Sequence, residues 1–263
     1  MTFALTLGLA AFATSLLTFF SGFGLGTLLL PVFALFVSAE VAVAATAVVH
    51  AANNLFKVGL LKDHARRDVV LKFGLPAVAA SFLGALVLTE ITGGGALFTW
   101  RLGGRMMEVQ TIELVLGVLI LGFALFELLP GLRNIDAPES WLPLGGALSG
   151  FFGGLSGHQG ALRAIFLAPL GLSTGEFAAT QAVIAVMVDL VRIGVYGWSL
   201  GWLAGAGTEV AVPWTPVGVA IAAALAGAVL GKRLLPKVTM DRLHLIVGWL
   251  LVVVGLGLAT GLA

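Results

Sequence analysis

The feature that most constrains this chain is a succession of apolar stretches. About 20 residues of α-helix cross the ~30 Å hydrocarbon core of a bilayer, so a stretch of that length predicts a membrane-spanning helix. The chain is 59% hydrophobic and 10% charged, and because soluble domains carry about a quarter charged residues, a water-soluble fold is excluded. We expect an all-α, polytopic membrane protein with spans at residues 41–61, 69–89, 109–129, 176–198, 213–235 and 243–262.

Composition also removes several classes of function. The absence of cysteine rules out disulfides, thiolate nucleophiles and cysteine-based metal or iron–sulfur sites. We expect no metal and no cofactor. A formal net charge of +1 argues against a nucleic-acid partner. The first residues lack the basic segment of a secretory signal, so we interpret them as part of the mature fold.

Two further apolar segments, residues 3–37 and 142–172, are too long for one untilted crossing at about 1.5 Å of rise per residue. Small or polar residues interrupt each of them, and glycine runs of this kind break helices. We call residues 21–26 the first tip and residues 156–160 the second tip.

The placement of basic residues predicts how the second of these segments runs. Lysine and arginine near the ends of spans collect on the cytoplasmic side of a membrane. Both basic loops can lie inside only if residues 142–172 cross an even number of times, which predicts a broken hairpin with its tip at residues 156–160. The two loops carry Lys62, His64, Arg66, Arg67 and Lys72, and Lys232, Arg233, Lys237 and Arg242.

The two halves of the chain align without gaps. Each half then holds one hairpin and three crossings, an odd number, which predicts inverted repeats at residues 1–135 and 136–263. Such repeats with paired glycine-interrupted segments indicate a transporter site between them. The alignment pairs Ser21 with Ser156, Gly22 with Gly157, Ser38 with Ser173, Asn54 with Asp189, Lys57 with Arg192 and Gly59 with Gly194. Residues 90–108 are predicted to form an outer loop, and residues 130–140 the linker between the halves.

The two tips are the first candidates for a binding site. Non-helical backbone at membrane depth is tolerated only where protein or water satisfies it, so the tips imply a cavity. A half-helix that starts after such a break directs its free N–H groups and positive dipole end there, which favours an anion. The alternative is that small residues simply allow close helix packing. The candidate anion-binding residues are Ser21, Gly22, Gly24, Ser156, Gly157, His158, Gln159, Gly160 and Arg163.

Arg163 is the strongest of these candidates, because its guanidinium could pair bidentately with an oxyanion. A structural pair with a carboxylate or backbone carbonyls is the alternative. His158 is either a proton carrier or a neutral group that holds the tip in shape. Gln159 either binds the anion or stabilises the tip.

The helix after each broken segment adds a second group of candidates. Asn53 and Asn54 join the binding candidates, with an interhelical hydrogen bond as the alternative for Asn53. Asp189 lies deep in its span and needs a partner or a proton. Arg192 lies three residues on, so an ion pair is the simplest expectation, and both residues join His158 as candidates for coupling or gating. Lys57 lies near the cytoplasmic end of its span and is expected to snorkel.

Two short motifs carry a resemblance to a known family. Residues 22–26 read Gly-Phe-Gly-Leu-Gly and lead to Pro31, and a glycine-rich run over residues 146–160 leads to Pro169. In these features, and over nearly its whole length, the chain resembles the TauE/SafE family of sulfite and organosulfur-anion exporters. The resemblance implies two homologous halves and a small anion such as sulfite or a sulfonate. This chain has fewer glycines than the family pattern. The first half keeps Gly22, Gly24 and Gly26, and the second half has His158, Gln159 and Arg163 in this region.

Two other functions stay open beside this one. An anion channel would use the same residues. A rhomboid-like intramembrane serine protease is suggested by residues 154–157, which fit G-x-S-G, with Ser156 as the nucleophile. A serine nucleophile needs a general base within hydrogen-bond reach. Neither histidine fits well, since His158 is expected to point away from Ser156 and His244 lies beside the basic loop.

We therefore expect a secondary transporter rather than an enzyme. It would export a small anion by alternating access from the cell inner membrane, as a multi-pass protein surrounded by membrane lipid. Proton coupling is a hypothesis, and a homodimer would be unsurprising.

Overall fold

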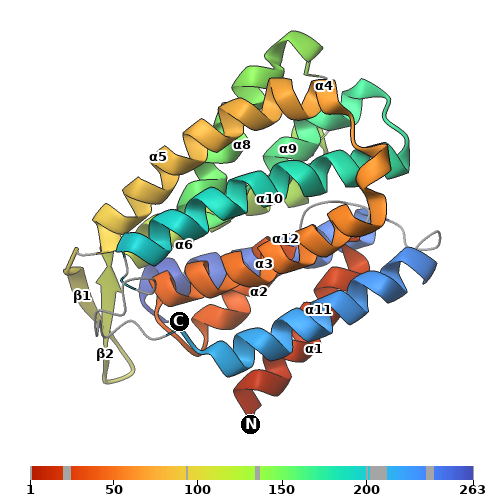
Figure 1. The fold of residues 1–263 in the computed structure, drawn as a ribbon. Helices are drawn as coiled ribbons and strands as arrows, with labels where there is room; N and C mark the ends of the chain where they lie inside the picture. The colour runs from red at the N-terminus through yellow and green to blue at the C-terminus, as the bar shows by residue number, and fades with distance from the viewer. Residues whose placement is uncertain are drawn as a thin grey trace.

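The structure is a computed structural model that describes residues 2–19, 25–92, 94–133, 137–199, 201, 212–234 and 240–262. Most of these residues are helical, as the apolar stretches predict (Figure 1). The α-helices are α1 (Thr2–Leu17), α2 (Leu25–Ala34), α3 (Ala39–Leu61), α4 (Arg67–Val69), α5 (Leu75–Thr92), α6 (Thr111–Leu128), α7 (Pro130–Arg133), α8 (Leu142–Ser156), α9 (Gly160–Leu167), α10 (Thr174–Ser199), α11 (Trp214–Leu234) and α12 (Met240–Thr260).

Five described helical stretches are long and apolar enough to cross a membrane. They confirm five of the six predicted spans, and the sixth falls on α12, whose apolar part is Val247–Thr260. One of the five, Arg67–Thr92, joins α4 and α5 through the π-helical turn η2 (Val70–Gly74). Shorter 3-10 turns are η1 (Lys62–His64), η3 (Glu139–Trp141) and η4 (Ala168–Leu170).

The segment predicted as an outer loop departs from the all-α expectation. It forms an antiparallel pair of strands, β1 (Ala96–Leu102) and β2 (Arg105–Gln110). Gly103 and Gly104 link them with φ of 56° and 84°, and a two-residue turn with both φ values positive matches the twist of a hairpin. Trp100 ties the hairpin to the end of α12 by donating to the Thr260 carbonyl at 2.8 Å. The expectation of a purely helical fold is wrong for this segment.

Both broken segments fold back on themselves. Phe3, at the start of α1, stacks on Phe36 just beyond α2, with ring centroids 4.5 Å apart. In the second segment, Gly145 of α8 lies against the Phe166 ring of α9. Contacts between the far ends of the arms mean that each pair of helices is antiparallel.

The helices are arranged about a central pair, α3 and α10, which lie side by side (Figure 1). On one side α5 packs on α8, on the other α1 packs on α11, and α6 packs on α12. The contact between α5 and α8 is close because Gly146, Gly150 and Gly154 lie directly against the α5 and η2 backbone. Small residues at every fourth position let membrane helices approach in this way. These three glycines, which precede the second tip, therefore serve helix packing.

Candidate functional site

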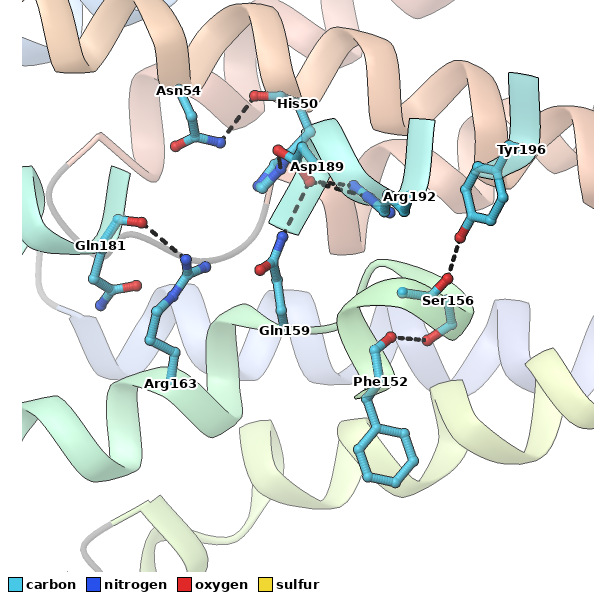
Figure 2. A network of polar contacts seen from close by, with 11 residues as sticks. His50, Asn54, Phe152, Ser156, Gln159, Arg163, Gln181, Asp189, Arg192 and Tyr196 are labelled. Atoms are coloured by element: carbon cyan, nitrogen blue, oxygen red, sulfur yellow. Dashed lines mark hydrogen bonds and ion pairs between the residues drawn. The ribbon is translucent and has the colours of Figure 1, made fainter. Parts of the chain in front are cut away.

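Asp189 of α10 is the centre of a buried polar network (Figure 2). His50 of α3 places Nδ1 2.6 Å from Asp189 Oδ2, a distance at which the imidazole N–H donates to the carboxylate. Gln159 of the second tip donates from Nε2 to Oδ1 at 3.1 Å. Arg192, one turn along α10, donates from Nε to the same oxygen at 3.0 Å. One carboxylate thus joins the two central helices to the second tip.

Arg192 confirms the expected ion pair and also lies over the second tip. Its Nη2 is 2.8 Å from Asp189 Oδ1, and neither side chain is exposed. Nη1 has no hydrogen-bond partner among the described residues. Gly157 ends α8 with φ of 82°, in the left-handed region that favours glycine. A Cβ there would lie 2.6 Å from Arg192 Nη1, so the absence of a side chain lets the guanidinium approach.

Arg163 of α9 is fully buried and only partly satisfied. Its Nη1 donates to the Gln181 carbonyl of α10 at 2.8 Å, which is the structural pairing weighed as its alternative. Its Nε and Nη2 have no hydrogen-bond partner among the described residues. Burying the N–H groups of a charged side chain without hydrogen-bond partners costs free energy. The geometry therefore leaves two donors of Arg163 available for an anion.

Ser156 and His158 contact each other, so the expectation that His158 points away is wrong. His158 Nδ1 lies 3.1 Å from Ser156 Oγ, because the chain turns sharply at Gly157. The Ser156 hydroxyl itself donates to the Phe152 carbonyl at 3.1 Å, a bond that serine commonly makes inside helices. The His158 ring stacks on Phe123 of α6, with centroids 5.2 Å apart.

The first tip lies mostly outside the described residues, which applies to Ser21, Gly22 and Gly24. Gly26, in the first turn of α2, is described: a Cβ there would lie 3.4 Å from His50 Cδ2 and 3.5 Å from the Gly157 carbonyl oxygen. The start of α2 therefore meets the second tip, and this contact brings the two hairpins together at the central helices. Gly160, the first residue of α9, is buried at the same junction.

The two asparagines of α3 make structural hydrogen bonds. Asn53 Oδ1 accepts a hydrogen bond from Ser15 of α1 at 2.9 Å, which is the interhelical bond weighed as its alternative. Asn54 Nδ2 donates to the carbonyl of His50 at 2.9 Å. Both residues are buried close to the network around Asp189.

Lys57 corrects a second expectation, because it does not snorkel. The residue is 4% exposed, and Nζ lies 3.4 Å from the carbonyl oxygens of Thr18 and Phe19. The ammonium also lies 5.2 Å from the centroid of the Phe19 ring. It therefore points toward the end of α1, the arm that leads into the first tip.

Sequence reasoning did not place three residues of this network. His50 was recognisable only as a polar residue deep in a span, since its partner Asp189 lies 139 positions away. Gln181 contributes a backbone carbonyl, which no side-chain pattern could reveal. Tyr196 donates its hydroxyl to the Gly154 carbonyl and ties α10 to α8 (Figure 2).

The sequence matches the model of a known protein family over most of its length. The family profile described as sulfite exporter TauE/SafE matches residues 7–258. The chain belongs to the TauE/SafE family. The matched region of this TauE/SafE protein includes both tips, both central helices and every residue of the network. Family and apolar helices together make it a multi-pass membrane protein of a transporter class. No curated protein and no solved structure gives a significant match.

Proposed function

We propose that this protein is a secondary transporter that exports a small oxyanion, such as sulfite, a sulfonate or a related organosulfur anion. The site lies where the second tip meets α3 and α10. The observation that carries the proposal is that Nε and Nη2 of Arg163 and Nη1 of Arg192 are buried without a hydrogen-bond partner in the described part of the chain. Charged donors in a low-dielectric site favour an anion that restores their hydrogen bonds.

Roles for the tip residues follow from their positions. Arg163 is the principal anion contact, and the backbone at Gly157 and Gly160 lets the anion approach the start of α9. Ser156, His158 and Gln159 shape the second tip. Ser21, Gly22 and Gly24 are proposed for the first tip because they correspond in register to the second. Asn53 and Asn54 support the site from α3.

The proposal includes two inverted repeats, residues 1–135 and 136–263, that move against each other. Two observations support it. Helices α2 and α9 begin at Leu25 and Gly160, and α3 and α10 begin at Ala39 and Thr174, a shift of 135 residues in both cases. The packing is also reciprocal, since α1 packs on α11 while α8 packs on α5, and α3 and α6 pack on their own counterparts α10 and α12.

Proton coupling remains a hypothesis within this proposal. Asp189 accepts hydrogen bonds from His50, Gln159 and Arg192. These contacts suit a carboxylate that stays charged and orients Arg192. His158 is the better proton carrier, because its Nε2 has no hydrogen-bond partner among the described residues. Transport that ignores an imposed pH gradient would remove the hypothesis. Insertion in the cell inner membrane and a homodimeric state belong to the same proposal.

Transport in proteoliposomes tests this function. We expect saturable uptake of labelled sulfite that unlabelled sulfite on the opposite side accelerates, as a carrier requires and a channel does not show. Arg163→Ala should abolish it. Arg66→Ala is the matched control, because the Arg66 side chain is exposed and pairs with its neighbour Asp68 at 2.7 Å. Unsaturable flux in the wild type would favour a channel, and loss of flux in both variants would remove Arg163 from the site.

A further inference from the structure

Buried charge is not balanced among the residues that the structure describes. Apart from histidine, the described residues include five buried side chains that can carry a charge. Three are basic and two are acidic: Lys57, Arg163, Arg192, Glu127 and Asp189. One carboxylate is engaged elsewhere, because Glu127 of α6 lies 2.6 Å from Nδ1 of His244 on α12. Asp189 pairs with Arg192. When Lys57 and both arginines are charged and His50 and His158 are neutral, the described residues around the second tip and Lys57 carry two more positive than negative charges.

Lys57 is the cation that the network around Asp189 does not explain. Its contacts to the Thr18 and Phe19 carbonyls are long, at 3.4 Å each, so they satisfy an ammonium only weakly. The nearest counterpart in the second half is Arg192, which occupies the corresponding position of α10. Arg192 has a carboxylate three residues earlier, Asp189, whereas Lys57 has the neutral amide of Asn54 there.

We propose that Lys57 is a specificity-determining residue of the transport site and that the site selects divalent over monovalent oxyanions. This inference rests on the proposed function. The first tip contains no charged residue. Lys57 of α3 places a positive charge beside the end of α1, which is the first arm of that hairpin. The transported anion then meets Arg163 from the second hairpin and the field of Lys57 from the first.

The sign and size of the surplus charge decide the preference. An isolated buried charge is strongly unfavourable, and the penalty falls when an ion of opposite charge neutralises it. A divalent anion such as sulfate, thiosulfate or fully ionised sulfite neutralises the surplus, whereas a monovalent sulfonate leaves one positive charge unmatched. Coulomb energy in a site of low dielectric constant makes this difference larger than it would be in water.

Calorimetric binding to the purified protein tests the inference with thiosulfate and methanesulfonate, at a pH where both anions are fully ionised. We expect the wild type to bind thiosulfate at least about tenfold more tightly, the factor that ~1.4 kcal/mol represents. Lys57→Met should reduce that ratio to within about threefold while methanesulfonate binding persists. Lys57→Arg should keep the ratio because the charge is kept. The matched control is Lys72→Met, since Lys72 is exposed and pairs with Glu139 at 2.8 Å.

The outcomes separate the two proposals. If neither anion binds the folded wild type, the proposed function fails at this site. If both bind with equal affinity, or if Lys57→Met binds both anions with the wild-type ratio, anion transport stands and the role of Lys57 is overturned, leaving it as a cap on the end of α1. Loss of the ratio in Lys57→Arg as well would show that the residue acts through shape rather than charge, which also overturns the inference.

Discussion

The two hairpins of this protein pack alike but differ in chemistry. In the second hairpin the polar groups belong to the hairpin itself: Gln159 reaches Asp189, and Arg163 reaches the Gln181 carbonyl. In the first hairpin the position that corresponds to Arg163 is Leu28, and positive charge comes only from Lys57 on the following helix. The comparison teaches that reciprocal helix packing does not require equivalent polar groups, and in the proposed function one half supplies most of the groups that bind the anion.

The largest expected effect on anion binding tests this difference between the hairpins directly. Arg163→Ala removes two buried donors that have no partner among the described residues, and we expect anion affinity to fall by about a hundredfold, since a charge-assisted hydrogen bond contributes about 1.5–3 kcal/mol. Leu28→Ala, at the corresponding position, should change affinity by less than about threefold because no hydrogen bond is lost. Titration calorimetry measures both. Equal losses would show that the hairpins contribute equally.

The carboxylate of α10 gives the largest expected effect on stability. Asp189→Asn leaves Arg192 buried without its counter-charge, and breaking a buried ion pair costs about 3–5 kcal/mol. Thermal unfolding in detergent should show a much lower Tm. The converse substitution, Asn54→Asp, places a carboxylate three residues before Lys57 and should keep the fold while weakening thiosulfate binding. A variant Asp189→Asn with wild-type Tm would contradict the network.

Two glycines, one from each hairpin, test whether the backbones of the hairpins meet as described. Gly157→Ala forces a side chain into φ of 82° beside Arg192 Nη1, and the left-handed conformation alone costs about 1–2 kcal/mol. Gly26→Ala meets His50 and the Gly157 carbonyl at ordinary contact distances of 3.4 and 3.5 Å. We expect a clear drop in Tm for the first and little change for the second. The reverse order would mean that the tips do not meet as described.

A last pair of effects on stability concerns two serines, Ser15 of α1 and Ser149 of α8, that donate hydrogen bonds within the protein. Ser15→Ala leaves the buried Asn53 Oδ1 without its donor, which costs about 1–3 kcal/mol. Ser149→Ala should cost less, about 1 kcal/mol, because its acceptor, the Gln159 carbonyl, also accepts from the Arg163 backbone N–H at 3.1 Å. Denaturation in detergent ranks the two. A larger loss for Ser149→Ala would contradict the assignment of these acceptors.

Much of the fold could be predicted from the sequence. Apolar length locates the spans, and the glycine interruptions locate the breaks in the two hairpins. The strands at residues 96–110 could not be predicted this way, because their stability comes from pairing with each other and from Trp100 reaching Thr260. The sequence likewise does not reveal that Gly146, Gly150 and Gly154 allow close packing on α5, because that role depends on which helix lies against α8.

The site was predictable in part. Asp189 and Arg192 lie three residues apart, and helical spacing alone predicts their ion pair. The pairing of His50 with Asp189 depends on how α3 packs on α10, which no local pattern reveals. Lys57 was misplaced for the same reason, since distance from a span end predicts snorkelling and only tertiary packing turns the ammonium toward Phe19. The contact of His158 with Ser156 likewise depends on the turn at Gly157.

The central claim is that a small oxyanion binds the buried guanidinium groups where the two hairpins meet. Crystals of the protein soaked with selenite, a heavier analogue of sulfite, would locate the anion by its anomalous scattering. The account predicts a selenium peak within hydrogen-bond reach of the Arg163 guanidinium, close to Arg192 and the start of α9, which disappears in crystals of Arg163→Ala. A peak confined to the protein surface, or one at the junction that persists in Arg163→Ala, would contradict it.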